Sequence, residues 1–182
     1  MKLYLIIHGE TEWNRDGRLQ GKVDVPLDVT GREQAELLRD RLAEVSFDIC
    51  IASPLERARE TAEIIMNDKC KIVFDERITE RDFGEYEGML VKDWEDSAGD
   101  VDTWDINLNW GERGYEPARH VLSRAKEFLE DVRSKYPPNY CIAIVAHGSL
   151  LKALHYNIVG YTDETDFHEV YFRNAEVKEY DI

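Results

Sequence analysis

Two histidines of this chain stand where a side chain can do chemistry. His8 and His147 each follow a short apolar run, and each is followed by a glycine, Gly9 or Gly148. A neutral imidazole is a competent nucleophile near pH 7, and a protonated one holds phosphate oxygens. A glycine beside it lets the backbone turn sharply and lets a ligand approach the N–H groups. A single histidine of this kind is more often an ordinary loop residue, whereas a matched pair favours a chemical role.

The apolar runs before these histidines are predicted strands. The pattern predicts short strands over residues 2–7, 47–52, 71–74 and 140–146, with helices between them. Strands that alternate with helices form a mainly parallel sheet, so we expect an α/β protein built as a three-layer α/β/α sandwich. Ligands of such sheets bind at the carboxyl ends of the strands. His8, Ser53 and His147 follow three of these ends, and we expect them to meet.

Capping and proline signals mark where the helices begin and end. A capping box at 30–33 predicts one helix start, and another at 53–56, with proline at the first helical position, opens a helix to about residue 67. Glu116 and Pro117 begin a long amphipathic helix. The remaining pattern predicts helices over 87–97 and 149–158 and strands over 168–173 and 176–181.

The domain organisation is predicted to be simple. Residues 1–182 contain no linker-like or low-complexity segment, and we expect one domain. The acid-rich residues 75–116 lack a clear period and contain Trp94, Trp104 and Trp110. We expect this segment to form a cap over the pocket, with its tryptophans packed as core residues.

Charge and composition exclude several classes of partner. The 182 residues carry 38 acidic and 23 basic side chains, a net charge of −15. Binding to nucleic acid or to an anionic membrane depends on Lys and Arg, so neither is expected, and no apolar run is long enough to span a bilayer. The three cysteines form no C-x-x-C pair, which is typical of the reducing cytoplasm. A phosphate site in so acidic a chain must collect its positive charge locally.

Several segments together resemble one family, the histidine phosphatase superfamily, also called phosphoglycerate mutase-like. The resemblance covers nearly the whole chain, with the segments in order and at ordinary spacing. They are residues 5–14 (LIIHGETEWN), 17–21 (GRLQG), 26–27 (PL), 30–35 (TGREQA), 53–62 (SPLERARETA), 80–88 (ERDFGEYEG) and 146–148 (AHG). The resemblance implies the phosphoglycerate mutase-like form of the α/β sandwich.

The resemblance also implies roles for individual residues. His8 would be the nucleophile that forms a phosphohistidine, and His147 would stabilise the phosphoryl oxygens in the transition state. Arg57 would clamp two phosphate oxygens, unless it merely pairs with Glu56 or Glu60 on its helix. Glu80 would protonate the leaving alkoxide and then deprotonate the attacking water. The residues expected to bind phosphate or substrate are Asn14, Gly9, Gln20, Gly21 and Gly148.

This mechanism needs neither a metal nor a cofactor, and the five histidines form no recognisable metal-ligand spacing. The expected partner is a small phosphorylated metabolite. The pattern leaves open which phosphate ester it is. It also leaves open whether the protein forms a homo-oligomer.

One position departs from the family motif. The family has R-H-G, and this chain has Ile7-His8-Gly9. Removing one preorganised donor from a developing charge lowers the rate on the order of 100- to 1,000-fold. Three nearby cations are candidates to compensate: Arg15, Arg18 and Lys22.

Three functions therefore compete. The leading hypothesis is a phosphatase for phosphate monoesters, weakened by Ile7. The second is a cofactor-dependent phosphoglycerate mutase, which ranks lower because such mutases usually have longer chains that enclose the site. The third is a catalytically impaired member that binds phosphorylated ligands, for which Ile7 is the main support.

Overall fold

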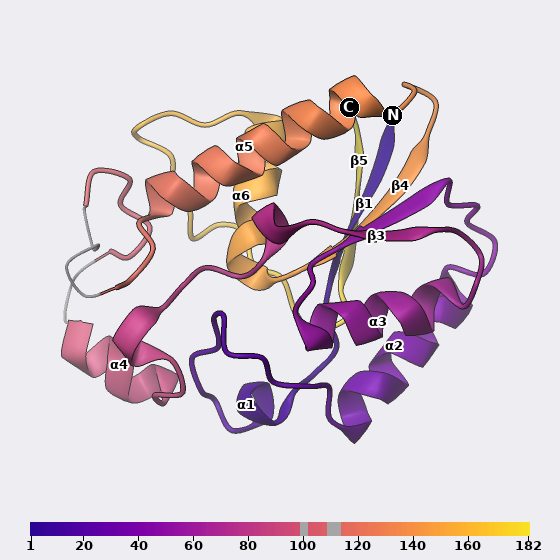
Figure 1. Cartoon of the computed structure of the whole chain (residues 1–182). Helices are drawn as coiled ribbons and strands as arrows, with labels where there is room; N and C mark the ends of the chain where they lie inside the picture. The colour runs from indigo at the N-terminus through magenta and orange to yellow at the C-terminus, as the bar shows by residue number, and fades with distance from the viewer. Residues whose placement is uncertain (99–101, 109–113) are drawn as a thin grey trace.

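A mainly parallel sheet runs through the centre of the protein (Figure 1). The computed structural model describes residues 1–98, 102–108 and 114–182. Within these ranges the sheet has five strands in the order β3-β2-β4-β1-β5. Only β5 runs antiparallel, and it borders β1 at the sheet edge. The strands are β1 (Lys2–Ile7), β2 (Ile49–Ala52), β3 (Ile72–Phe74), β4 (Cys141–Ala146) and β5 (Val177–Asp181). The predicted α/β class is confirmed.

Helices cover both faces of the sheet. The α-helices are α1 (Glu12–Arg15), α2 (Val29–Arg41), α3 (Glu56–Met66), α4 (Val91–Ala98), α5 (Ala118–Lys135) and α6 (Gly148–Val159), and two short 3₁₀ helices are η1 (Glu76–Ile78) and η2 (Gly84–Tyr86). Helices α2 and α3 pack on one face, and α5 and α6 pack on the other (Figure 1). None of the helices in the described ranges combines the length and apolarity needed to cross a bilayer.

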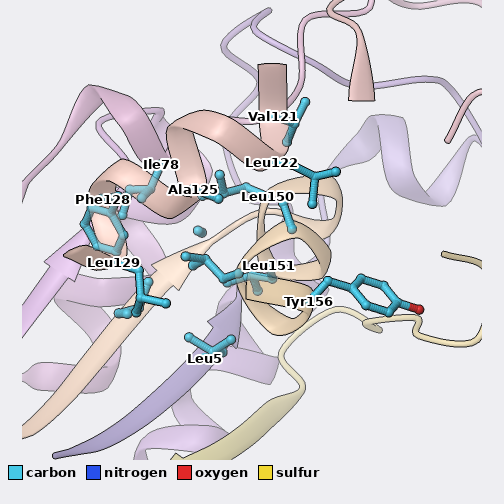
Figure 2. Packing of buried hydrophobic residues seen from close by; sticks show 14 of the residues in the cluster. Leu5, Ile78, Val121, Leu122, Ala125, Phe128, Leu129, Leu150, Leu151 and Tyr156 are labelled. Atoms are coloured by element: carbon cyan, nitrogen blue, oxygen red, sulfur yellow. The ribbon is translucent and has the colours of Figure 1, made fainter. Parts of the chain in front are cut away.

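Strand β1 shows why the two layers form. Its residues alternate between the faces: Leu3 and Leu5 join the cluster under α5 and α6, whereas Tyr4 and Ile6 join the cluster under α2 and α3. Because both faces are covered, the strand is buried and largely apolar from Leu3 to Ile7. Figure 2 shows Leu5 facing the side chains of α5 and α6. Burying one such side chain stabilises the fold by roughly 1.5–3 kcal/mol.

The strand order brings three predicted site residues to one edge. Strand β4 lies between β1 and β2, and Ile7 of β1 is level with Ala146 of β4. His8 N–H donates to the Ala146 carbonyl at 3.1 Å, and Ser53 N–H donates to the Val145 carbonyl at 3.0 Å. The residues that follow these strands therefore leave the sheet side by side.

Two predicted helix starts are wrong. Helix α2 begins at Val29 because Asp28, and not Thr30, is its N-cap: the Asp28 carboxylate accepts the N–H of Gly31 at 2.8 Å. Helix α3 begins at Glu56 without a side-chain cap: the Ser53 hydroxyl accepts the N–H of Leu55 at 3.3 Å, before the helix, and lies 2.8 Å from a ring nitrogen of His147.

Two predicted elements after residue 75 also differ. Residues 168–173 form no strand: this segment follows the buried Phe167 and includes the buried Phe172, which pack on the α6 side of the core. Helix α4 begins at Val91, four residues later than predicted. Trp110 and parts of the predicted cap, residues 99–101 and 109–113, lie outside the described residues.

Candidate active site

The ring of His8 is held by its own backbone neighbourhood. Nδ1 lies 2.7 Å from the Gly9 carbonyl oxygen, which can only accept, so Nδ1 carries the ring proton and Nε2 keeps its lone pair. Burial lowers the pKa of His8 to about 3, and the positive charge of Arg57 contributes to this lowering. His8 is therefore a neutral imidazole at physiological pH with an available nitrogen.

His147 lies against His8. The two ring centroids are 5.2 Å apart with an interplanar angle of 57°. Nε2 of His147 lies 2.8 Å from the Ser53 hydroxyl. When that hydroxyl donates to Nε2, Nδ1 carries the proton, and this buried nitrogen has no partner among the described residues. Burial, Arg57 and His8 all lower the pKa of His147 well below its usual range, so His147 is a second neutral imidazole.

Arg57 lies in the first turn of α3, and its side chain is completely buried. Nη1 donates to the Val23 carbonyl at 3.1 Å and Nη2 to the Gly21 carbonyl at 2.7 Å. Burial lowers its pKa to about 10, so it remains a cation at neutral pH. The alternative of an exposed arginine paired along the helix is wrong: Glu60 pairs with Arg32 instead, at 2.6 Å.

Asn14 and Gln20 form a polar wall. The Asn14 Oδ1 atom accepts the N–H of Thr11 at 3.1 Å and the side-chain amide of Asn174 at 3.2 Å. The Gln20 Oε1 atom accepts the Thr11 hydroxyl at 3.0 Å. Because both amide oxygens are engaged, the amide nitrogens are directed elsewhere as donors.

Three buried side-chain nitrogens have no hydrogen-bond partner within the described ranges. They are Gln20 Nε2, Arg57 Nε and His147 Nδ1, and no other buried side-chain nitrogen or oxygen described is in this state. A buried donor without an acceptor costs roughly 1–3 kcal/mol, so such groups need a reason. All three belong to residues predicted to contact phosphate. Each of these nitrogens can donate to an oxyanion, His147 Nδ1 when it carries the ring proton.

Glu80 is a buried carboxylate on the cavity that His8 lines. Its Oε1 accepts the N–H of Arg81 at 2.7 Å, and its Oε2 accepts the N–H of Ser149 at 3.2 Å. Arg124 holds the segment by donating to the Glu80 carbonyl at 3.1 Å. Burial raises the pKa of Glu80, and the two N–H groups and Arg57 oppose this effect. A raised pKa suits a group that must give up a proton near neutral pH.

A cavity of about 240 Å³ opens beside His8. The predicted site residues that line it are His8, Asn14, Gln20, Glu80 and Gly148. Arg57 and His147 are completely buried and do not line it, so they lie beneath its surface.

Two glycines predicted to contact phosphate have other roles in this geometry. The Gly9 N–H donates to the Thr61 hydroxyl at 3.0 Å, and a Cβ at Gly9 would collide with the Gly31 carbonyl. Gly21 does not line the cavity, but its carbonyl holds Arg57. Both residues therefore position the site through backbone packing.

The candidates to replace the missing arginine separate clearly. Arg15 pairs with Glu12 at 3.2 Å, and Lys22 pairs with Asp82 at 3.4 Å; neither lines the cavity. Arg18 does line it, although its Nη1 donates to the Gly88 carbonyl at 2.8 Å. Ile7 itself lines the cavity as an apolar side chain.

Sequence reasoning missed several polar residues of the cavity, among them Lys152 and Asn174. Lys152 lines the cavity one helical turn after Gly148, and this i, i+4 spacing was a usable signal. Asn174 donates to the His8 carbonyl at 3.2 Å, but it lies in a loop where no pattern predicts contact with His8. Within the described ranges, no three His, Cys, Asp or Glu residues are arranged to hold a metal ion.

Fold and site together define a phosphoglycerate mutase-like protein with two facing histidines. The family model described as histidine phosphatase superfamily (branch 1) matches residues 3–182. The chain belongs to this superfamily.

Named relatives agree with this assignment. Phosphoserine phosphatase 1 of Hydrogenobacter thermophilus is 35% identical over 163 residues, covering 88% of this chain and 77% of the relative. A probable 2-carboxy-D-arabinitol-1-phosphatase of Arabidopsis thaliana is 32% identical over 177 residues, covering 95% of this chain, which spans only 35% of that longer protein. The α-ribazole phosphatase structure from Shigella flexneri superposes with a TM-score of 0.84 at 28% identity, covering 98% of this chain and 89% of that chain. These findings support a phosphatase or mutase-like function.

Proposed function

We propose that the protein hydrolyses phosphate monoesters through a phosphohistidine at His8. The observation that carries this proposal is that three residues expected to bind phosphate have buried, unpartnered nitrogens, while His8 is a neutral imidazole. Donors aimed at a developing oxyanion are usually the largest single contribution to such catalysis. The phosphatase names of several relatives support the same reaction class.

The first step transfers the phosphoryl group. The Nε2 lone pair of His8 forms a bond to phosphorus while the bond from phosphorus to the ester oxygen breaks. Glu80, whose pKa is raised by burial, gives a proton to the leaving oxygen, so the alcohol leaves neutral. The Gly9 carbonyl keeps the proton on Nδ1 and stabilises the ring as it becomes positive.

The second step restores the enzyme. Glu80, now a carboxylate, takes a proton from water as the water oxygen attacks phosphorus, and the bond from phosphorus to Nε2 breaks. Inorganic phosphate leaves, and His8 and Glu80 return to their starting states. Arg57 and His147 stabilise the phosphoryl oxygens in both steps.

The setting of this reaction follows from the same residues. Glu80, Phe83, Val91 and Trp104 all line the cavity, which supports the idea that the described part of 75–116 acts as a cap within one domain. The three free cysteines favour the reducing cytoplasm as the site of action. The substrate class is a small phosphorylated metabolite. The apolar Ile7 leaves the site short of one cation, so we expect a slow enzyme.

Replacing His8 by Ala tests the mechanism. The wild-type protein is expected to hydrolyse p-nitrophenyl phosphate without added metal and to form an acid-labile, base-stable phosphoenzyme, and His8→Ala should lose both. The exposed His120 on α5 provides a matched control, since His120→Ala should change neither. Full activity in His8→Ala would refute the mechanism. Interconversion of 3- and 2-phosphoglycerate faster than hydrolysis would favour the mutase.

A further inference from the structure

Lys152 is a cavity-lining cation that the proposed steps do not use. It lies on α6, three residues after Ser149, whose N–H holds Glu80 at 3.2 Å. Residues three or four apart share a helix face, so Lys152 lies about one turn, roughly 5 Å, farther along the cavity wall than the proton donor. Because Glu80 is the proposed proton donor to the leaving oxygen, a cation on the same cavity wall is a candidate to contact the leaving alcohol.

The charged groups that act on Lys152 differ from those that act on the two histidines. His8 and His147 are each influenced by Arg57, and His147 also by His8. Burial and Arg81 lower the pKa of Lys152, and Asp102, Asp166 and Glu80 raise it. Glu80 is influenced by Arg57 and itself influences Lys152, so both cations lie within electrostatic range of its carboxylate.

The ammonium of Lys152 has no anionic partner of its own. Nζ lies 4.8 Å from the centroid of the Trp104 ring, and no hydrogen bond or salt bridge from a described residue reaches it. Asp102 instead bonds His168 at 2.9 Å. The buried Arg81 guanidinium lies 5.2 Å from the same tryptophan ring, so two like charges are held close together. A partly buried cation in this position is favourable when an anion binds beside it.

The walls around Lys152 restrict what that anion can be. Phe83, Val91, Trp104 and Phe172 give the cavity apolar walls, and Trp104 lies against Lys152 itself. Arg18 is the other cation described on the lining, and its Nη1 is held by the Gly88 carbonyl. A single ammonium balances a carboxylate, whereas a second phosphate dianion would need more positive charge.

We infer that Lys152 binds a carboxylate on the alcohol portion of the substrate, so the protein prefers phosphate esters of hydroxy acids. This inference rests on the proposed phosphatase function and adds to it a substrate class and a specificity residue.

Two substrates that differ only at the relevant group test the inference. 3-Phosphoglycerate carries a carboxylate where glycerol 3-phosphate carries a hydroxymethyl group. The wild-type protein should favour 3-phosphoglycerate in kcat/KM by about tenfold or more, the usual effect of a charged hydrogen bond. In Lys152→Met this ratio should fall about 10- to 100-fold, mainly through KM, and Lys152→Arg should retain most of it. The exposed Lys126 on α5 is the control: Lys126→Met should leave the ratio unchanged.

Two results would overturn the inference while leaving the phosphatase proposal intact. One is a wild-type protein that hydrolyses p-nitrophenyl phosphate but shows no preference between the two esters. The other is a Lys152→Met protein in which both esters lose activity equally, since Lys152 would then serve the shared phosphate. If the wild-type protein hydrolyses no ester, the proposed function fails, and calorimetry then tests Lys152 separately. The inference requires 3-phosphoglycerate to bind about tenfold more tightly than glycerol 3-phosphate, and only when Lys152 is present.

Discussion

Replacing Ile7 by Arg restores the charge that the family motif places beside the nucleophile. Ile7 ends β1, is 6% exposed, and lines the cavity together with His8. Its Cδ1 atom lies 3.9 Å from where a Cβ on Gly148 would stand, so the side chain extends toward the start of α6. A longer side chain from the same Cα can therefore place a guanidinium within the cavity.

The expected gain follows from the charges already present. Arg57 lies beneath the cavity surface, and Arg18 and Lys152 line the cavity, so the phosphoryl group has few cations close to it. One preorganised donor contributes about 2.7–4 kcal/mol to the transition state, or roughly 100- to 1,000-fold in kcat. The substitution also removes buried apolar area worth about 1.5–3 kcal/mol. We expect Ile7→Arg to be faster and less stable.

The assay compares kcat for p-nitrophenyl phosphate and for an alkyl phosphate in three proteins: wild type, Ile7→Arg and Ile7→Met. Ile7→Met is the control, because its side chain is long but uncharged, and it should show no gain in kcat. Thermal unfolding establishes that each variant is folded. A folded Ile7→Arg protein with less than about a threefold gain in kcat would refute the idea that the site lacks a cation.

Three further predictions concern the same residues. Glu80→Gln should slow the first turnover of an alkyl phosphate by about 100- to 10,000-fold. It should spare the first burst of p-nitrophenolate, because this leaving group needs no acid. Stopped-flow measurements compare the two substrates, and an equal loss of rate for both would show that Glu80 is not the acid. Because burial lowers the pKa values of His8 and His147, the unfolded chain binds protons at these residues below about pH 6.5 while the folded protein does not, so the free energy of unfolding falls as the pH falls. In urea titrations, His8→Ala should recover up to about 2 kcal/mol of the loss between about pH 6.5 and 5. If the free energy of unfolding depends on pH equally in both proteins, the prediction is wrong. Gly9→Ala should lower the free energy of unfolding by about 1–3 kcal/mol, because its Cβ meets the Gly31 carbonyl; an unchanged melting temperature would argue against that contact.

The sequence was sufficient to predict the sheet and the positions of both histidines. Strands such as β1 and β4 are buried on both faces, and an element of this kind must be a continuous apolar run. Their connection through helices requires parallel pairing, and parallel strands release their following residues at a common edge. His8, Ser53 and His147 could therefore be predicted to meet before any coordinates were known.

Local signals failed where a polar side chain had a choice of partners. The Ser53 hydroxyl suits a helix cap, but it lies 2.8 Å from His147 instead. The helix predicted from Thr30 begins earlier because Asp28 reaches Gly31 first. Both Asp and Ser are good helix N-caps. The neighbouring residues in the sequence do not show whether such a side chain caps its own helix or bonds to a residue far along the chain.

Only the tertiary structure decided what surrounds the two histidines. The buried Arg57 donates to the carbonyls of Gly21 and Val23, and Asn174 donates to the His8 carbonyl from a loop far along the chain. Lys152 is a candidate specificity residue because the fold places its ammonium beside the Trp104 ring, where no described carboxylate forms a salt bridge with it. Residue types and spacing identify groups that can react, because those properties are local. Burial, unpaired donors and perturbed pKa values arise from contacts between distant segments, and the chain creates these only when it folds.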